Sequence, residues 1–119
     1  MRLTAAAVWI GAWALFGVPW DVSTIDFSSD RILWTLVPST TRQVVDVVLN
    51  FVFYIPLGIL FRSFGMNAVP ALAGGALLSA ATETLQLFSP TRVPNLADLV
   101  FNTAGVAVGL VLVRRRRSD

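Results

Sequence analysis

The sequence predicts an all-α integral membrane protein, a bundle of four helices in a single domain that spans residues 1–119. Two observations predict this class. Of the 119 residues, 55% are hydrophobic and only 13% are charged, with a mean hydropathy of +0.72, which leaves too little polar surface for a soluble fold of this size. Four apolar stretches also follow one another along the chain. The expected helices lie at residues 3–20, 41–62, 68–88 and 96–113.

The composition also restricts the chemistry. The chain contains no cysteine, no histidine and no lysine, which excludes disulfides, zinc-thiolate sites, imidazole acid–base catalysis and Schiff bases. Any chemistry must therefore use carboxylates, arginines, hydroxyl groups or a bound ion.

The sequence pI is about 10.5, but four of the arginines form the run Arg114–Arg117 directly after the last apolar stretch. Such a run is typical of a cytoplasmic anchor, so we expect no nucleic-acid partner.

A cleaved signal peptide is the alternative to a retained first helix. The triplet Ala12-Trp13-Ala14 weakly resembles a cleavage site, but it lies inside the apolar run of residues 3–20 rather than after it. We therefore predict a retained helix, which Pro19 ends. Its tryptophans are expected to anchor it at the membrane interface or to pack against other helices: Trp9, Trp13 and Trp20.

A polar segment, residues 21–41, separates the first two helices. The apolar run within it, residues 32–38, is too short to cross a bilayer. We expect this run to lie in the membrane interface or to fold back over the helices.

Polar side chains mark the start of each later helix. Thr40 and Gln43, three residues apart, form a capping box for the second helix. Asn67 is expected to cap the third helix. Asn95 is typical of an N-cap for the fourth, with Asp98 completing a pair like a capping box.

The arginines predict how the bundle is oriented. Loops on the cytoplasmic side of a membrane carry an excess of positive residues. The larger group lies at one set of helix ends and the smaller group at the other: Arg2, Arg62 and Arg114–Arg117 against Arg31, Arg42 and Arg92. Both termini are therefore predicted to be cytoplasmic, in a multi-pass protein.

Polar residues recur along one face of each of the last three helices. Charged groups in apolar segments are costly, roughly 2.5–3.5 kcal/mol each at the centre of a bilayer. The predicted topology places the start of the second helix, the end of the third and the start of the fourth at the same outer depth. The candidate site at that depth comprises Arg42, Asp46, Asn50, Glu83, Gln86, Arg92, Asp98 and Asn102.

Four segments around these residues form a recognisable pattern. They read Asp46-x3-Asn50, Tyr54-Ile55-Pro56-Leu57-Gly58, Glu83-x2-Gln86-Leu87-Phe88-x-Pro90-x-Arg92 and Asp98-x3-Asn102-Thr103-x-Gly105-x3-Gly109. The pattern resembles the signature of the VanZ-like membrane proteins over about residues 32–113, although Asn95 stands where the family pattern has an aspartate. The resemblance implies a protein of the bacterial cytoplasmic membrane. It also implies a link to resistance against teicoplanin, a lipid-tailed glycopeptide that acts at the outer face.

We expect the candidate site to face the extracytoplasmic side and to bind or act on an anionic lipid or a lipid-linked cell-envelope molecule. Arg42 and Arg92 would hold the anionic group. Glu83 and Asp98 would be the catalytic, proton-transfer or orienting groups. The remaining polar residues would complete substrate binding: Asp46, Asn50, Gln86 and Asn102. Sequence alone does not decide between a binder and an enzyme.

Other interpretations of the same residues stay open. Glu83 would serve only as a helix–helix clasp if it pairs with Arg42 or Arg92, and capping alone would explain Asp98. No cofactor is expected; a Mg²⁺ site from the carboxylates is compatible with their chemistry, but the spacing is generic. If the glycines of Gly105-xxx-Gly109 contact a partner, the chain would instead be a non-catalytic accessory protein. The partner would be a larger envelope enzyme or transporter, or a second copy of the chain. An ion-coupled carrier ranks last.

Overall fold

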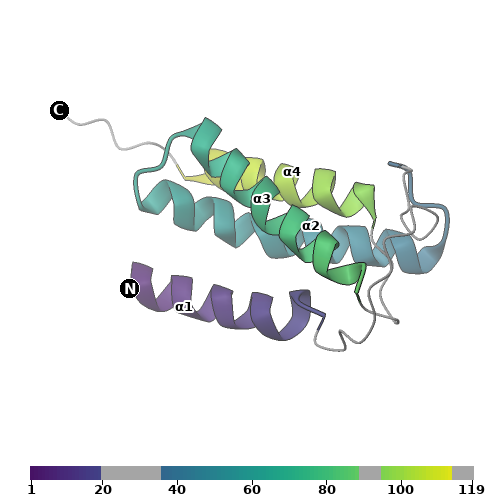
Figure 1. The fold of residues 1–119 in the computed structure, drawn as a ribbon. Coiled ribbons are helices and arrows are strands. Elements are labelled where there is room, and N and C mark those ends of the chain that lie inside the picture. Colours follow the sequence, from purple (N-terminus) through teal and green to yellow (C-terminus); the bar gives the residue numbers. More distant parts are fainter. Residues whose placement is uncertain (20–35, 89–94, 114–119) are drawn as a thin grey trace.

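The computed structural model describes residues 1–19, 36–88 and 95–113, and these form a helical bundle (Figure 1). Its elements are α1 (Arg2–Ala12), the π-helical turn η1 (Trp13–Gly17), α2 (Thr41–Ser63), α3 (Ala68–Gln86) and α4 (Leu96–Leu112). The all-α prediction is confirmed. Most of the expected interfacial segment, together with Trp20, Arg31 and Arg92, lies outside the described residues.

The first helix differs from the prediction at its end. It widens into the π-helical turn η1, in which the Val18 N–H donates to the Trp13 carbonyl at 3.1 Å. Val18 then adopts an extended conformation, with φ −84° and ψ 127°. Because the residue before a proline disfavours the helical region, the helix ends at Gly17, two residues before Pro19 and three before the predicted end.

The bundle has an apolar exterior and several buried polar side chains. Two helices, Thr41–Ser63 and Ala68–Gln86, are long and apolar enough to cross a membrane, while Arg2–Gly17 and Leu96–Leu112 are shorter apolar helices. Side chains on the outside include Leu3, Val8, Leu15, Val48, Val52, Val69, Leu77 and Val111. The buried polar residues are Ser79, Thr82, Gln86, Asn95, Asp98 and Asn102. Buried polar side chains beneath an apolar exterior are unusual in soluble proteins.

Helices that follow one another in the chain run in opposite directions, so α1 and α3 begin at one end of the bundle, whereas α2 and α4 begin at the other and run parallel to each other. Arg2 Nη1 donates to the Ser63 carbonyl at 2.7 Å, and its guanidinium lies 5.8 Å from the centre of the Phe64 ring. The N terminus of α1 therefore meets the C terminus of α2 (Figure 1). Arg2 and Arg62 share this end, and the start of α2 lies at the opposite end.

Glycines bring α2 and α4 into backbone contact, which is the most extensive helix packing in the bundle. A Cβ placed on Gly109 would collide with the Ile55 carbonyl and lie 2.8 Å from Gly58 Cα. A Cβ on Gly105 would collide with the Phe51 carbonyl. The predicted close approach at Gly105-xxx-Gly109 is therefore made within the chain, against α2.

Two of the three expected helix caps form through the N-cap side chain. Thr40 Oγ1 accepts from the Gln43 N–H at 3.2 Å, whereas Gln43 Oε1 accepts from the Ser39 N–H at 2.8 Å instead of returning to Thr40. Asn95 Oδ1 accepts from the Ala97 N–H at 2.9 Å. Asn67 occupies the N-cap position of α3 without a side-chain cap hydrogen bond.

Trp9 packs α1 against α2. It is buried, its indole Nε1 donates to the Phe53 carbonyl at 2.9 Å, and its ring stacks on Phe53 with centroids 5.1 Å apart. Tyr54 meets the same ring edge-on at 5.6 Å. Below this contact the core is apolar, formed by Leu57, Ala71, Val106 and Leu110. Trp9 therefore packs inside the bundle.

Trp9→Phe is expected to keep the aromatic packing but lose the indole hydrogen bond. We expect a loss of about 1 kcal/mol in unfolding free energy, the usual net contribution of one such bond. Unfolding by sodium dodecyl sulfate in detergent micelles, followed by circular dichroism, measures it. Leu3→Phe, on the exposed face of the same helix, is the control. Equal stability of Trp9→Phe and the wild type would contradict the assignment.

Candidate functional site

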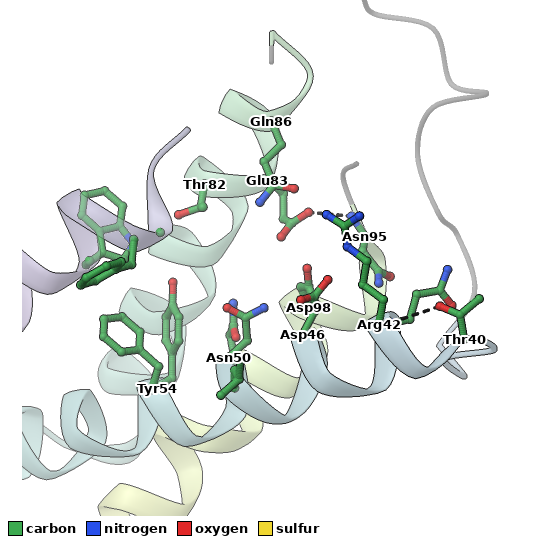
Figure 2. A pocket seen from close by; sticks show the side chains of 17 residues that line it. Thr40, Arg42, Asp46, Asn50, Tyr54, Thr82, Glu83, Gln86, Asn95 and Asp98 are labelled. Carbon is green, nitrogen blue, oxygen red and sulfur yellow. Dashed lines mark hydrogen bonds between the residues drawn. The ribbon is translucent and has the colours of Figure 1, made fainter. Parts of the chain in front are cut away.

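A cavity of about 920 Å³ lies at the end of the bundle opposite Arg2. Its walls come from η1, the first half of α2, the end of α3 and the start of α4 (Figure 2). Seven of the eight residues predicted for the site line it: Arg42, Asp46, Asn50, Glu83, Gln86, Asp98 and Asn102. The eighth, Arg92, lies outside the described residues. The structure thus brings the described candidates together, while their chemical roles stay predictions.

Glu83 joins the end of α3 to the start of α4. Its Oε2 accepts from the buried Asn95 N–H at 2.6 Å (Figure 2). A capping box at this helix would have placed the Asp98 carboxylate on that N–H, and the structure gives the position to Glu83 instead. The carboxylate also lies at the N-terminus of α4, where a negative charge interacts favourably with the helix dipole. Glu83 thus has a structural function through this hydrogen bond, while its pairing with Arg42 or Arg92 stays a prediction.

The start of α2 supplies one wall of the cavity. Arg42, Asp46 and Asn50 follow one another at intervals of four residues and therefore face the same way. Arg42 and Asp46 are exposed and Asn50 is half-buried, so the exposure of this wall decreases from Arg42 to Asn50. Figure 2 shows the Arg42 side chain directed toward Glu83 and Asn95. A guanidinium here is available to a ligand at the cavity mouth.

Asn102 and Ser79 form the deepest polar contact of the site. Asn102 Nδ2 donates to Ser79 Oγ at 2.8 Å, and both side chains are buried. Asn102 Oδ1 is buried as well and accepts no hydrogen bond from the part of the chain that the structure describes. A buried acceptor of this kind favours a donor from water or from a ligand. Asp98, one turn earlier on α4, is also buried.

Sequence reasoning missed several lining residues. Tyr54 continues the four-residue interval of Arg42, Asp46 and Asn50, so the periodicity of α2 already contained it. Figure 2 shows its hydroxyl pointing toward Thr82, which lies one turn before Gln86 on α3. The contribution of the first helix had no such signal: Trp13, Phe16 and Gly17 read as apolar span residues, yet all three line the cavity.

No group of three or more Asp, Glu, His or Cys side chains within residues 1–19, 36–88 and 95–113 is placed to hold a metal ion. The suggested Mg²⁺ site gains no support from this geometry. Among the residues that the structure describes, the cavity lining offers a guanidinium, carboxylates, amides, hydroxyl groups and a phenol: Arg42, Asp46, Glu83, Asp98, Gln43, Asn50, Gln86, Asn95, Asn102, Thr40, Thr82 and Tyr54.

An all-helical bundle with apolar spans and a polar cavity at one end belongs to the class of helical membrane proteins. Comparison with known families identifies it further. The family model described as VanZ/LLP1 matches residues 4–117, so the chain belongs to the VanZ/LLP1 family. The resemblance noted in the sequence is confirmed, and the match extends through α1. Neither the curated proteins nor the solved structures contain a match.

Proposed function

We propose that this VanZ-like protein binds, in the outer leaflet of the bacterial cytoplasmic membrane, the anionic headgroup of a lipid or lipid-linked envelope molecule. One observation carries the proposal. A single cavity gathers the costly polar side chains of α2, α3 and α4 at one end of a bundle whose exterior is apolar. Intramembrane ionisable groups that face a cavity usually mark a ligand path or site.

The distribution of arginines supports the outer location. Arg2 and Arg62 lie together at the end away from the cavity. The C-terminal half of α4 packs against the C-terminal half of α2, toward this same end, and in the sequence Arg114–Arg117 follow α4. The positive-inside rule assigns such an end to the cytoplasm. The cavity then faces the extracytoplasmic side, where a lipid-tailed glycopeptide such as teicoplanin acts.

Within the cavity the proposed roles differ by position. Arg42, exposed at the mouth, offers a planar fork that matches phosphate or carboxylate; Arg92 is assigned the same role from the sequence. Asn50, Gln86 and Asn102 orient the bound group through their amides. Glu83 and Asp98 are the candidate proton-transfer groups if the bound molecule is chemically altered.

Arg42→Gln is expected to weaken the binding of an anionic amphiphile on the order of tenfold or more, because a hydrogen bond to a charged group contributes about 1.5–3 kcal/mol. Tryptophan fluorescence reports binding, since Trp13 lines the cavity. The titrant is dioctanoyl phosphatidylglycerol, with a short polyprenyl phosphate as the second arm, added to purified protein in neutral detergent.

Two variants control this measurement. Arg62→Gln removes an equal charge at the opposite end of the bundle and should bind as the wild type does. Arg42→Lys keeps the charge but loses the bidentate fork, so its affinity should fall between those of the wild type and Arg42→Gln. Unchanged affinity of Arg42→Gln for both amphiphiles would refute the proposed headgroup site. A wild-type protein that binds neither, and purifies with another membrane protein, would favour the accessory function.

A further inference from the structure

One part of the cavity lining is apolar. It consists of Trp13, Phe16 and Gly17 from η1 with Leu49 and Phe53 from α2. The hydrogen-bonding side chains come mainly from the helix faces around Arg42, Glu83 and Asp98. An enclosed site for a small polar ion would not need such an aromatic and aliphatic wall, whereas a molecule with both polar and apolar parts matches it.

Two residues of this wall belong to the cavity and to the outside of the bundle at once. Phe16 is 75% exposed and Leu49 is 62% exposed, although both line the cavity. The exterior of α2 beside Leu49 continues as an apolar surface through Val45, Val48 and Val52. The cavity therefore opens through the flank of the bundle, onto the apolar surface that faces hydrocarbon when the helices span a bilayer.

The π-helical turn η1 forms the end of the first helix at this opening. The π-helical turn ends at Gly17, directly before the extended Val18 and Pro19, so α1 ends beside the cavity. At Gly17 a side chain would approach the Trp13 ring, since a Cβ there would lie 3.2 Å from Trp13 Cδ1. Single π-helical turns inside helices occur frequently at functional sites.

We propose that the ligand is an amphiphile that enters sideways from the bilayer, with its hydrocarbon chain leaving the cavity between Phe16 and Leu49 while its anionic headgroup reaches Arg42. The headgroup part rests on the function proposed above; the chain exit rests on the flank opening alone. A water-soluble anion of the same charge lacks the chain and has no use for this opening.

The absence of cysteine from the chain makes a clean test available. Leu49→Cys places a thiol at the proposed exit, and N-phenylmaleimide then fills it. Val48→Cys is the matched control, since Val48 is exposed on the same helix but does not line the cavity. Binding of dioctanoyl phosphatidylglycerol and of glycerol phosphate, its headgroup without chains, is measured before and after labelling.

Labelled Leu49→Cys should bind the amphiphile on the order of tenfold more weakly, the effect of losing the contacts of about two methylene groups. Its affinity for glycerol phosphate should not change, and labelled Val48→Cys should bind both as before. A phosphatidylglycerol that carries a diazirine near the chain terminus should crosslink in the wild type to peptides that contain Phe16 or Leu49. Unchanged amphiphile binding after labelling, or crosslinks confined to other faces, would overturn the chain exit.

The two proposals fail differently in these experiments. If Arg42→Gln binds normally but the crosslinks fall on Phe16 and Leu49, the headgroup assignment is wrong and the exit stands. If Arg42→Gln binds weakly and the labelled Leu49→Cys variant is unaffected, the exit is wrong and the headgroup site stands.

Discussion

Gly109→Ala is expected to destabilise the bundle by about 3 kcal/mol, near the upper end of the usual cost of overpacking a core. The added methyl would meet the Ile55 carbonyl and lie 2.8 Å from Gly58 Cα. Both are backbone atoms, so no side chain can rotate away. α2 and α4 must then separate, and their packing is the most extensive in the fold. Unfolding by sodium dodecyl sulfate, followed by circular dichroism, measures the change.

Gly11→Ala is the matched control for this substitution. Gly11 is also a helical glycine, but a Cβ added there meets nothing within 4 Å. Alanine in an open helix interior is more favourable than glycine by roughly 0.5–1 kcal/mol, so this variant should equal or exceed the wild type in stability. Equal stability of the Gly109→Ala and Gly11→Ala variants would mean that α2 and α4 do not touch through their backbones.

The bundle was accessible from sequence because its signals are local and repeated. Hydropathy defined the apolar stretches, Thr40 and Asn95 marked helix starts by their capping chemistry, and the small residues Gly105 and Gly109 predicted a close helix contact. The shared depth of Arg42, Glu83 and Asp98 followed from alternating helix direction alone. The first three signals are short-range rules that act on neighbouring residues, and the fourth needs only the order of the helices.

What sequence did not predict depends on relations between helices. The Asn95 N–H is matched by Glu83, twelve positions earlier in the chain, where the local rule pointed to Asp98. The π-helical turn of η1 has no composition signal, since Trp13 and Phe16 suit any apolar span. The sequence was compatible with both expected roles of Trp9, interfacial anchor or packing residue. Its contact with Phe53 identifies it as a packing residue. These outcomes are decided by which helix lies beside which.

Glu83 is the residue whose replacement separates a structural clasp from a functional carboxylate. Glu83→Leu leaves the buried Asn95 N–H without its acceptor, which should cost about 1–3 kcal/mol of unfolding free energy. Glu83→Gln keeps an oxygen at the same place and loses only the charge. Its cost should stay near the 0.3–1 kcal/mol of a charge at a helix N-terminus. The same detergent unfolding measurement compares the two variants.

If the carboxylate acts on a ligand, Glu83→Gln should lose function although it costs little stability. Complementation of a deletion strain, scored by teicoplanin susceptibility at matched expression, should then fail for Glu83→Gln as fully as for Glu83→Leu. Thr84→Val, an exposed neighbour on α3, should complement normally. Full complementation by Glu83→Gln would leave Glu83 as a clasp between α3 and α4, since a carboxamide can hold the Asn95 N–H but cannot carry a negative charge or transfer a proton as a carboxylate does.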